Sequence, residues 1–263
     1  MTGLNLIRIP IATQHLARWA AERGLGWIQR RSSTVGFDEG RALHHLIGEV
    51  FGPDALGPFR LLVPPRMTTG NLYAYSMLEA GALRDTAAVQ AMPDHLNVLR
   101  LDGLASKSMP DAWRAGQRLG FDLRTRPVRR LRGDLETPAG RVSKGKEIDA
   151  YLLEALRHHP EVRDGMIREN RSREAVYLDW LAERLGSGAE LDRHASRLAR
   201  FRRVRVARGN ASSEGPDATF HGTLTVTDPT SFAALLARGV GRHRAYGYGM
   251  LLLRPPNRPE PER

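Results

Sequence analysis

The chain has 263 residues, of which 41% are hydrophobic, and its 40 lysines and arginines against 29 acids give a net charge of +11 at pH 7. The absence of cysteine excludes a disulfide framework, a cysteine-based zinc site and a thiol nucleophile. No apolar run approaches the ~18 residues of a membrane span, and the N-terminus lacks the layout of a signal peptide, so we expect a soluble, cytoplasmic protein without a membrane partner.

The first half of the chain predicts an alternation of strands and helices. The clearest helix covers 37–52, where Leu43, Leu46, Ile47 and Val50 recur at helical spacing before Gly52 and Pro53 end it. The other expected elements are strands at 4–11, 59–65, 71–78 and 96–103, and a helix at 81–92. The resulting order, βαββαβ, is that of a ferredoxin-like unit.

The pattern of the second half is compatible with a repeat of that order, with one additional helix. Asp228 suits the N-cap of a helix over 228–239, and Gly239 suits its end. The remaining expected elements are strands at 117–130, 201–209, 218–228 and 248–255, and helices at 146–159 and 173–186. We therefore expect an α+β fold of two tandem ferredoxin-like (RRM-like) domains, 1–112 and 113–255, followed by a Pro-rich disordered tail, 256–263.

The positive charge is gathered in two runs of arginine. The run at 193–208 contains no acid and the run at 114–132 contains one. A GC-rich genome that favours arginine codons is an alternative explanation, but scattered codon bias does not produce such runs. Arginine's planar fork suits phosphate groups, so the pattern favours a nucleic-acid partner.

A glycine-rich loop near the C-terminus combines flexible backbone with positive charge. In "RGVGRHRAYGYGML" (238–251), Arg242, His243 and Arg244 lie between the glycines at Gly239, Gly241, Gly247 and Gly249. Glycine allows backbone N–H groups to approach a phosphate closely. The alternative is a turn that only packs a helix against a strand.

The segment 220–253, "FHGTLTVTDPTSFAALLARGVGRHRAYGYGMLLL", resembles the C-terminal signature of the CasE (Cse3) endoribonucleases. These are the CRISPR-RNA-processing subunits of type I-E Cascade, in the repeat-associated RNA-binding superfamily. "FDLRTRPVRR" (121–130) and "REAVYLDWLAERL" (173–185) also resemble segments of that family. The resemblance implies that the glycine-rich loop faces RNA.

The resemblance also implies an activity. Members of the family cleave a CRISPR repeat hairpin without metal or another cofactor, through attack of a 2′-hydroxyl that leaves a 2′,3′-cyclic phosphate and a 5′-hydroxyl. The implied partners are the repeat hairpin, the mature crRNA, which stays bound, and other Cascade subunits; outside the complex a monomer is expected. Such a reaction needs a proton-transfer group that titrates near neutrality, and histidine is the natural candidate.

The resemblance places the catalytic histidine in the first helix, in "RALHHLIGEVF" (41–51). His44 takes the catalytic position, with His45 one residue out of register, and Arg41 takes a position where the family often has tyrosine. Arg41 and His44 share a helix face, so both are expected at the phosphate. A helix histidine without a chemical role is the alternative.

Further cations are expected to contact the RNA. The resemblance assigns Lys144 and Lys146 to a basic loop that supports the transition state, whereas an ordinary solvated loop is the alternative. The predicted RNA-binding residues are Arg129, Arg130, Arg132, Arg203, Arg205, Gly239, Gly241, Arg242, His243 and Arg244. Phosphate contacts predominate in this expectation, because the deep major groove of A-form RNA hides its bases. No spacing of histidines or acids suggests a metal site.

Two other functions fit the same residues. One is a non-catalytic RNA-binding or scaffold subunit of a CRISPR ribonucleoprotein, with Arg41 marking a decayed site. The other is an unrelated basic RNA-binding protein. Cleavage separates an enzyme from a scaffold, and specific binding of a repeat hairpin separates both from the third possibility.

Overall fold

The computed structural model describes residues 3–29, 34–137, 140–158, 171–208 and 211–256. Contacts divide the chain into two units. The first contains Met1–Trp113, Arg205–Ser213 and Ala233–Leu251, and the second contains Arg114–Val204, Glu214–Phe232 and Leu252–Arg263. The domain bounds expected from the sequence, 1–112 and 113–255, remain a prediction. Residues 159 and 209, at expected element ends, and tail residues 257–263 lie outside the described residues.

The first sheet has the ferredoxin-like order β4-β5-β1-β6. Its strands are β1 (Asn5–Ala12), β4 (Phe59–Leu62), β5 (Thr69–Ser76) and β6 (Ala105–Ser108), and the helices that connect them include α2 (Glu39–Phe51) and α3 (Ala80–Gln90). Strand β1 pairs antiparallel with β5, with Ile7 opposite Ala74 and Ile9 opposite Leu72. Ile7, Ile9 and Ile11 are fully buried because alternate residues of a strand point to the same face.

The structure adds elements between β1 and α2 that were not predicted from the sequence. They are α1 (Thr13–Glu22), β2 (Gly26–Gln29) and β3 (Thr34–Phe37), the last two forming a hairpin. Helix α1 buries Leu16, Trp19 and Ala20. The insertion lengthens the connection to α2 beyond that of a minimal ferredoxin-like unit.

The predicted strand at 96–103 is wrong. The segment instead forms α4 (Pro93–Val98) and a 3₁₀ turn, Leu101–Gly103. His95 and Val98, three residues apart, are buried while Leu96 is exposed, which is a helical pattern, and Pro93 favours the first turn of a helix. The edge strand that follows, β6, is exposed at every position and therefore has no alternation of apolar residues to indicate it.

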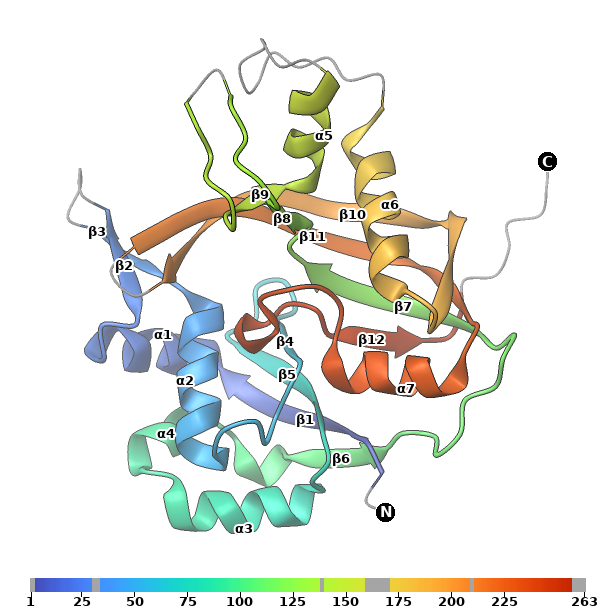
Figure 1. Cartoon of the computed structure of the whole chain (residues 1–263). Helices are drawn as coiled ribbons and strands as arrows, with labels where there is room; N and C mark the ends of the chain where they lie inside the picture. The colour runs from blue at the N-terminus through green and yellow to red at the C-terminus, as the bar shows by residue number, and fades with distance from the viewer. Residues whose placement is uncertain (1–2, 30–33, 138–139, 159–170, 209–210, 257–263) are drawn as a thin grey trace. The chain divides into compact units, whose positions relative to one another are not determined.

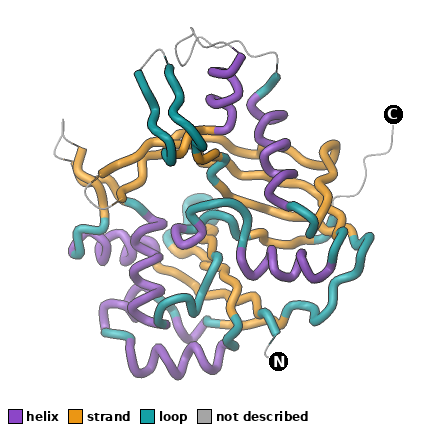
Figure 2. Tube along the Cα trace, in the orientation of Figure 1, coloured by secondary structure: helices purple, strands orange, loops and turns teal. Residues whose placement is uncertain are grey.

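The second sheet repeats the ferredoxin-like order as β10-β11-β7-β12 (Figures 1 and 2). Its strands are β7 (Arg118–Thr125), β10 (Ala189–Arg208), β11 (Ala211–Val226) and β12 (Leu251–Arg254), with α6 (Arg173–Leu185) and α7 (Pro229–Arg238) as connecting helices. The side chain of Asp228 accepts a hydrogen bond from the backbone N–H of Ser231 at 2.6 Å, and Gly239 has φ +80°, as a helix cap and stop require. The two-sheet α+β fold of tandem ferredoxin-like domains is confirmed.

The expected strand at 117–130 is in fact two strands. Strand β7 ends at Thr125, and β8 (Val128–Arg130) pairs with β9 (Glu147–Asp149) in a separate two-stranded sheet. Helix α5 (Ala150–His158) consequently begins four residues later than expected, because Glu147–Asp149 belongs to the strand. Pro127 lies at the break, where it cannot donate a ladder hydrogen bond.

Candidate active site and nucleic-acid interface

Helix α2 presents His44 and His45 outside the core. Asp38 caps the helix by accepting a hydrogen bond from the backbone N–H of Arg41 at 3.0 Å. The buried face of the helix consists of Ala42, Leu43, Leu46, Ile47, Val50 and Phe51. His44 and His45 are both exposed, with ring centroids 5.6 Å apart. His44 is therefore not a core histidine, and its imidazole is accessible to a ligand.

A pocket of about 390 Å³ opens beside His44 within the first unit. It is formed by α2, by the segment that follows α2 and by the glycine-rich loop, which lies beside α2 and β4 (Figure 1). The charged and titratable residues that line it are His44, Asp54, Arg238 and Arg244. Arg244 donates a hydrogen bond from Nη1 to the backbone carbonyl of Arg238 at 2.8 Å, which fixes the Arg244 guanidinium against the end of α7.

His44 is exposed enough to meet a ligand but is partly desolvated by the protein around it, and this partial burial lowers its pKa below the ordinary value of 6.5. The neighbouring His45 lowers the pKa further, and Asp54 opposes the shift in part. At neutral pH the imidazole is therefore mostly neutral. A neutral imidazole in a pocket that also contains two arginines is suited to accept a proton from a hydroxyl while the cations attract a phosphate.

The glycine-rich loop has a left-handed backbone at each of its four glycines. The φ values are +80° for Gly239 and Gly241, +78° for Gly247 and +81° for Gly249. The backbone N–H of Val240 donates to the carbonyl of Gly249 at 2.8 Å, and a Cβ at Gly249 would lie 2.5 Å from the carbonyl oxygen of Val240. The loop therefore needs glycine for its own closure. This is a structural role, as in the alternative that the glycines only form a turn between a helix and a strand. Arg242 is exposed, and His243 also has positive φ.

Three of the four residues predicted for catalysis are exposed. Arg41 is half-buried in the first turn of α2, one turn before His44. Lys144 and Lys146 lie in the second unit, just before β9, and both are exposed. The backbone N–H of Lys144 donates to the carboxylate of Asp134 at 2.6 Å, which fixes the backbone of this loop. The catalytic roles of these residues stay predictions.

A second pocket, of about 770 Å³, lies within the second unit and is lined by arginines. Arg129, Arg130 and Arg132, predicted as RNA-binding residues, all line it. Its lining also includes residues that were not predicted from the sequence, Arg157 of α5 and Arg184 of α6, as well as Leu131, Leu135 and Leu153. The pocket thus combines five arginines with apolar side chains and two acids, Asp134 and Glu183.

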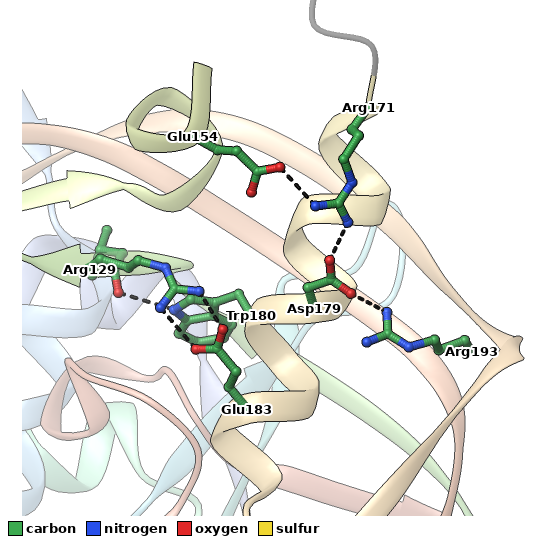
Figure 3. Close-up of polar contacts among 8 residues, drawn as sticks. Arg129, Glu154, Arg171, Asp179, Trp180, Glu183 and Arg193 are labelled. Atoms are coloured by element: carbon green, nitrogen blue, oxygen red, sulfur yellow. Dashed lines mark hydrogen bonds and ion pairs between the residues drawn. The ribbon is translucent and has the colours of Figure 1, made fainter. Parts of the chain in front are cut away.

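Arg129 is already engaged within the protein. Its guanidinium donates two hydrogen bonds to the carboxylate of Glu183, at 2.9 and 2.7 Å. Beside it, Nε1 of Trp180 donates to the backbone carbonyl of Val128 at 3.1 Å, so α6 holds β8 through two neighbouring side chains (Figure 3). The main role of Arg129 in this structure is therefore to hold α6 and β8 together. Within the part of the chain that the structure describes, Arg132 and Arg157 have no carboxylate partner.

Ion pairs also hold the helices that carry Arg157 and Arg184. Arg171 donates to Glu154 of α5 at 2.8 Å and pairs with Asp179 of α6, which in turn pairs with Arg193 of β10 (Figure 3). The pairs join α5, α6 and β10. Arg157 and Arg184 thus lie on helices that are held together.

The arginines of β10 differ in the groups that they contact. Arg203 pairs with Glu214 at 3.1 Å, and Arg205 is exposed. Arg202 donates to the buried Asp217 at 2.7 Å, and Asp217 also accepts two hydrogen bonds from Arg124, at 2.9 and 3.0 Å. Part of the arginine run therefore neutralises a buried carboxylate, while the RNA-binding roles of Arg203 and Arg205 stay predictions.

Neither a metal cluster nor a membrane helix is found in the described ranges. No group of three or more histidines and acids there could hold a metal ion. In the same ranges, no helix is both long and apolar enough to cross a membrane.

Comparisons with known proteins agree with this fold. Two solved structures of CRISPR endoribonuclease Cse3 bound to RNA are similar along the chain. The first, with a 19-nt RNA, has TM-score 0.61 and 17% identity over 96% of this chain and 100% of that one. The second, Thermus thermophilus Cse3 with an RNA representing a pre-cleavage complex, has TM-score 0.57 and 20% identity over 96% and 100%. The likeness shows the fold.

A third similar structure is the CRISPR-associated protein Cas6e from Escherichia coli, with TM-score 0.54 and 17% identity over 95% of this chain and 99% of that one. No curated protein sequence matches the chain. The sequence itself matches the family described as CRISPR associated protein over residues 6–255, nearly its whole length. The resemblance expected from the C-terminal segment is thereby confirmed at the level of family, and the chain belongs to the CRISPR associated protein family.

Proposed function

We propose that the protein is an endoribonuclease that cleaves CRISPR repeat hairpin RNA in precursor crRNA. The observation that carries the proposal is the exposed His44, with a lowered pKa, in a pocket that also holds Arg238 and Arg244. Family membership and a fold shared with RNA-bound Cse3 structures support an RNA substrate.

The proposed reaction is a transesterification that needs no metal. The 2′-hydroxyl next to the scissile phosphate loses its proton to neutral His44, and its oxygen forms a bond to phosphorus. The bond between phosphorus and the 5′-oxygen breaks, and that oxygen takes up a proton from water, to which His44 afterwards returns the proton that it accepted. The products are a 2′,3′-cyclic phosphate and a 5′-hydroxyl, so atoms and charge balance without a redox partner.

The arginines supply electrostatic stabilisation in this proposal. Negative charge grows on the phosphate oxygens in the transition state, and Arg238 and Arg244 lie in the pocket where that charge develops. Arg41, one turn before His44, is proposed as a further phosphate contact. Lys144 and Lys146 keep their proposed supporting role.

The second unit is proposed to bind the hairpin stem. Arg130 and Arg132, with Arg157 and Arg184 from the helices, form a cationic rim suited to phosphates. Binding of this kind explains how the enzyme retains its product, the mature crRNA, as a subunit of Cascade. Outside that complex we propose a monomer.

The test is a cleavage assay on the repeat hairpin from the host's own array, in excess EDTA. Wild type, His44→Ala and His45→Ala are compared, because the two histidines are adjacent and both exposed. A single cut that persists in EDTA and is lost only in His44→Ala supports the proposal. Tight binding without a cut by wild type supports the scaffold function instead, and the absence of both contradicts any role on repeat RNA.

A further inference from the structure

The aromatic ring of Tyr246 lies against the imidazole of His44. The ring centroids are 5.1 Å apart with an interplanar angle of 46°. Tyr246 ends the 3₁₀ turn Arg244–Tyr246 of the glycine-rich loop, and its backbone N–H donates to the carbonyl of His243 at 2.9 Å. The two rings come from segments about two hundred positions apart in the sequence, so only the fold brings them together.

Gly40 allows this turn to rest on α2. A Cβ at Gly40 would lie 2.4 Å from the carbonyl oxygen of Tyr246 and 3.3 Å from its Cβ. Gly40 and His44 are four residues apart and therefore share one face of the helix. The backbone of the loop thus occupies the place of a side chain one turn before His44, and the Tyr246 ring reaches the imidazole from there.

On the other side, the turn rests against the first sheet. A Cβ at Gly247, the residue after Tyr246, would lie 3.3 Å from Cε2 of Phe59, which is buried. The turn is therefore fixed by α2 on one side and by β4 on the other. The position of Tyr246 is therefore set by the packing of its own backbone against α2 and β4.

We propose that Tyr246 is a positioning residue for His44, whose ring restricts the imidazole to the rotamer that faces the pocket. The effect of this positioning on catalysis rests on the proposed function. A histidine free to rotate would spend part of its time away from the reacting hydroxyl, and misplacement of about 1 Å can cost about a hundredfold in rate. The ring also covers one side of the imidazole and contributes to its burial.

The charged surroundings of His44 are known from the elements packed around it. His45, Asp54, Arg238 and Arg244 either line the pocket or influence the His44 pKa, and Tyr246 lies against the ring. Arg41 lies one turn before His44 on α2. Burial is the largest cause of the lowered His44 pKa. Removing the Tyr246 ring therefore raises the pKa toward 6.5, whereas a phenylalanine keeps the ring and the burial.

The experiment compares Tyr246→Ala, Tyr246→Phe and Gly40→Ala with wild type. Gly81→Ala in α3 is the matched control, because a Cβ there meets nothing within 4 Å. Two quantities are measured: the His44 pKa, by NMR titration of the imidazole in the RNA-free protein, and the single-turnover cleavage rate together with the hairpin Kd.

Tyr246→Ala is expected to raise the His44 pKa and to slow cleavage about tenfold or more, with Kd nearly unchanged. Tyr246→Phe is expected to restore most of the cleavage rate. Gly40→Ala moves the loop and behaves like Tyr246→Ala, while Gly81→Ala leaves both quantities unchanged. Thermal unfolding shows whether each variant is folded. If Gly40→Ala does not fold, the comparison of Tyr246→Ala with Tyr246→Phe alone tests whether Tyr246 positions His44.

The outcomes separate this inference from the proposed function. If His44→Ala abolishes cleavage while Tyr246→Ala cleaves at the wild-type rate, Tyr246 has no positioning role and the proposed function stands. If wild type does not cleave, the proposed function fails, and the titration still reports on the packing of the two rings. An unmoved His44 pKa in Tyr246→Ala then overturns the inference.

Discussion

Arg129 and Glu183 form a bidentate ion pair, with hydrogen bonds of 2.9 and 2.7 Å, that ties β8 to α6 (Figure 3). The hydrogen bonds from Arg129 hold the pKa of Glu183 below its ordinary value. An arginine that the sequence assigned to RNA is thus already neutralised by the protein. Other arginines of the same pocket, Arg132 and Arg157 among them, remain for phosphate.

Arg132→Ala is therefore expected to weaken hairpin binding more than Arg129→Ala does. Removing one cation that touches a phosphate lowers the slope of log K against log salt by about 1, and Arg132 has no carboxylate partner among the described residues to share its charge. Kd measured across a salt series gives both the affinity and the slope. An equal or larger loss of affinity in Arg129→Ala contradicts the assignment of Arg129 as a mainly structural residue.

The glycine-rich loop gives a second expectation for binding. Gly241→Val forces a β-branched residue to φ +80°, at a cost of about 1–2 kcal/mol, and Arg242→Ala removes an exposed charge. Both variants are expected to fold and to bind the hairpin more weakly. Circular dichroism checks the fold and a binding titration checks the affinity. Unchanged affinity in both variants would show that this loop does not face RNA.

The carboxylate of Asp217 is expected to be important for stability. Burial raises its pKa, but the hydrogen bonds from Arg124 and Arg202 outweigh burial and hold the pKa below 3.8. Asp217→Ala removes the carboxylate that neutralises Arg124 in a largely buried place, and we expect a loss of about 3 kcal/mol in the free energy of unfolding. Glu214→Ala, which breaks the exposed pair with Arg203, is the control and should cost under about 1 kcal/mol.

The same carboxylate gives a pH dependence of stability. Because its folded-state pKa is lowered, its stabilisation is complete above pH 3.8 and disappears as the pH falls through the lower folded value. Urea unfolding at a series of acidic pH values should show wild type losing its advantage over Asp217→Ala in that range. A constant difference between the two proteins down to the lowest pH would be evidence against the assignment.

Cleavage itself should follow the titration of His44. Because the His44 pKa is lowered, a rate that depends on the neutral imidazole should fall toward acid pH with a midpoint below 6.5. The single-turnover rate against pH tests this. A fall in rate with its midpoint above pH 6.5 would assign the controlling proton to another group.

The sequence predicts those parts of the fold that show a periodic pattern. Helix α2 is predicted within two residues because its apolar positions recur at helical spacing, and the same pattern places His44 on the outside. Strand β6 is exposed at every position and α4 is short, so periodicity indicates neither. The pairing of β8 with β9 could not be predicted either, because the arginine-rich segment 117–130 shows no apolar pattern that marks the break at Pro127.

The residues that surround His44 could not be predicted from periodic patterns in the sequence. Tyr246 reaches the His44 ring, and Arg238 reaches the pocket, because the chain returns to the first unit after the second sheet begins. No local sequence pattern encodes that return. Arg157 and Arg184 are polar positions on amphipathic helices, where charge is ordinary. Only the glycines of the loop give a local signal, because positive φ at four positions demands them.

The proposal that His44 supports attack by a 2′-hydroxyl has one most direct test. It is cleavage of the repeat hairpin in EDTA, beside the same RNA with a single 2′-deoxy nucleotide at the cut site. We predict one cut in the ordinary RNA with a 2′,3′-cyclic phosphate end, no cut in the deoxy RNA, and no cut by His44→Ala. Cleavage of the deoxy substrate, or full activity in His44→Ala, would contradict the proposed role of His44.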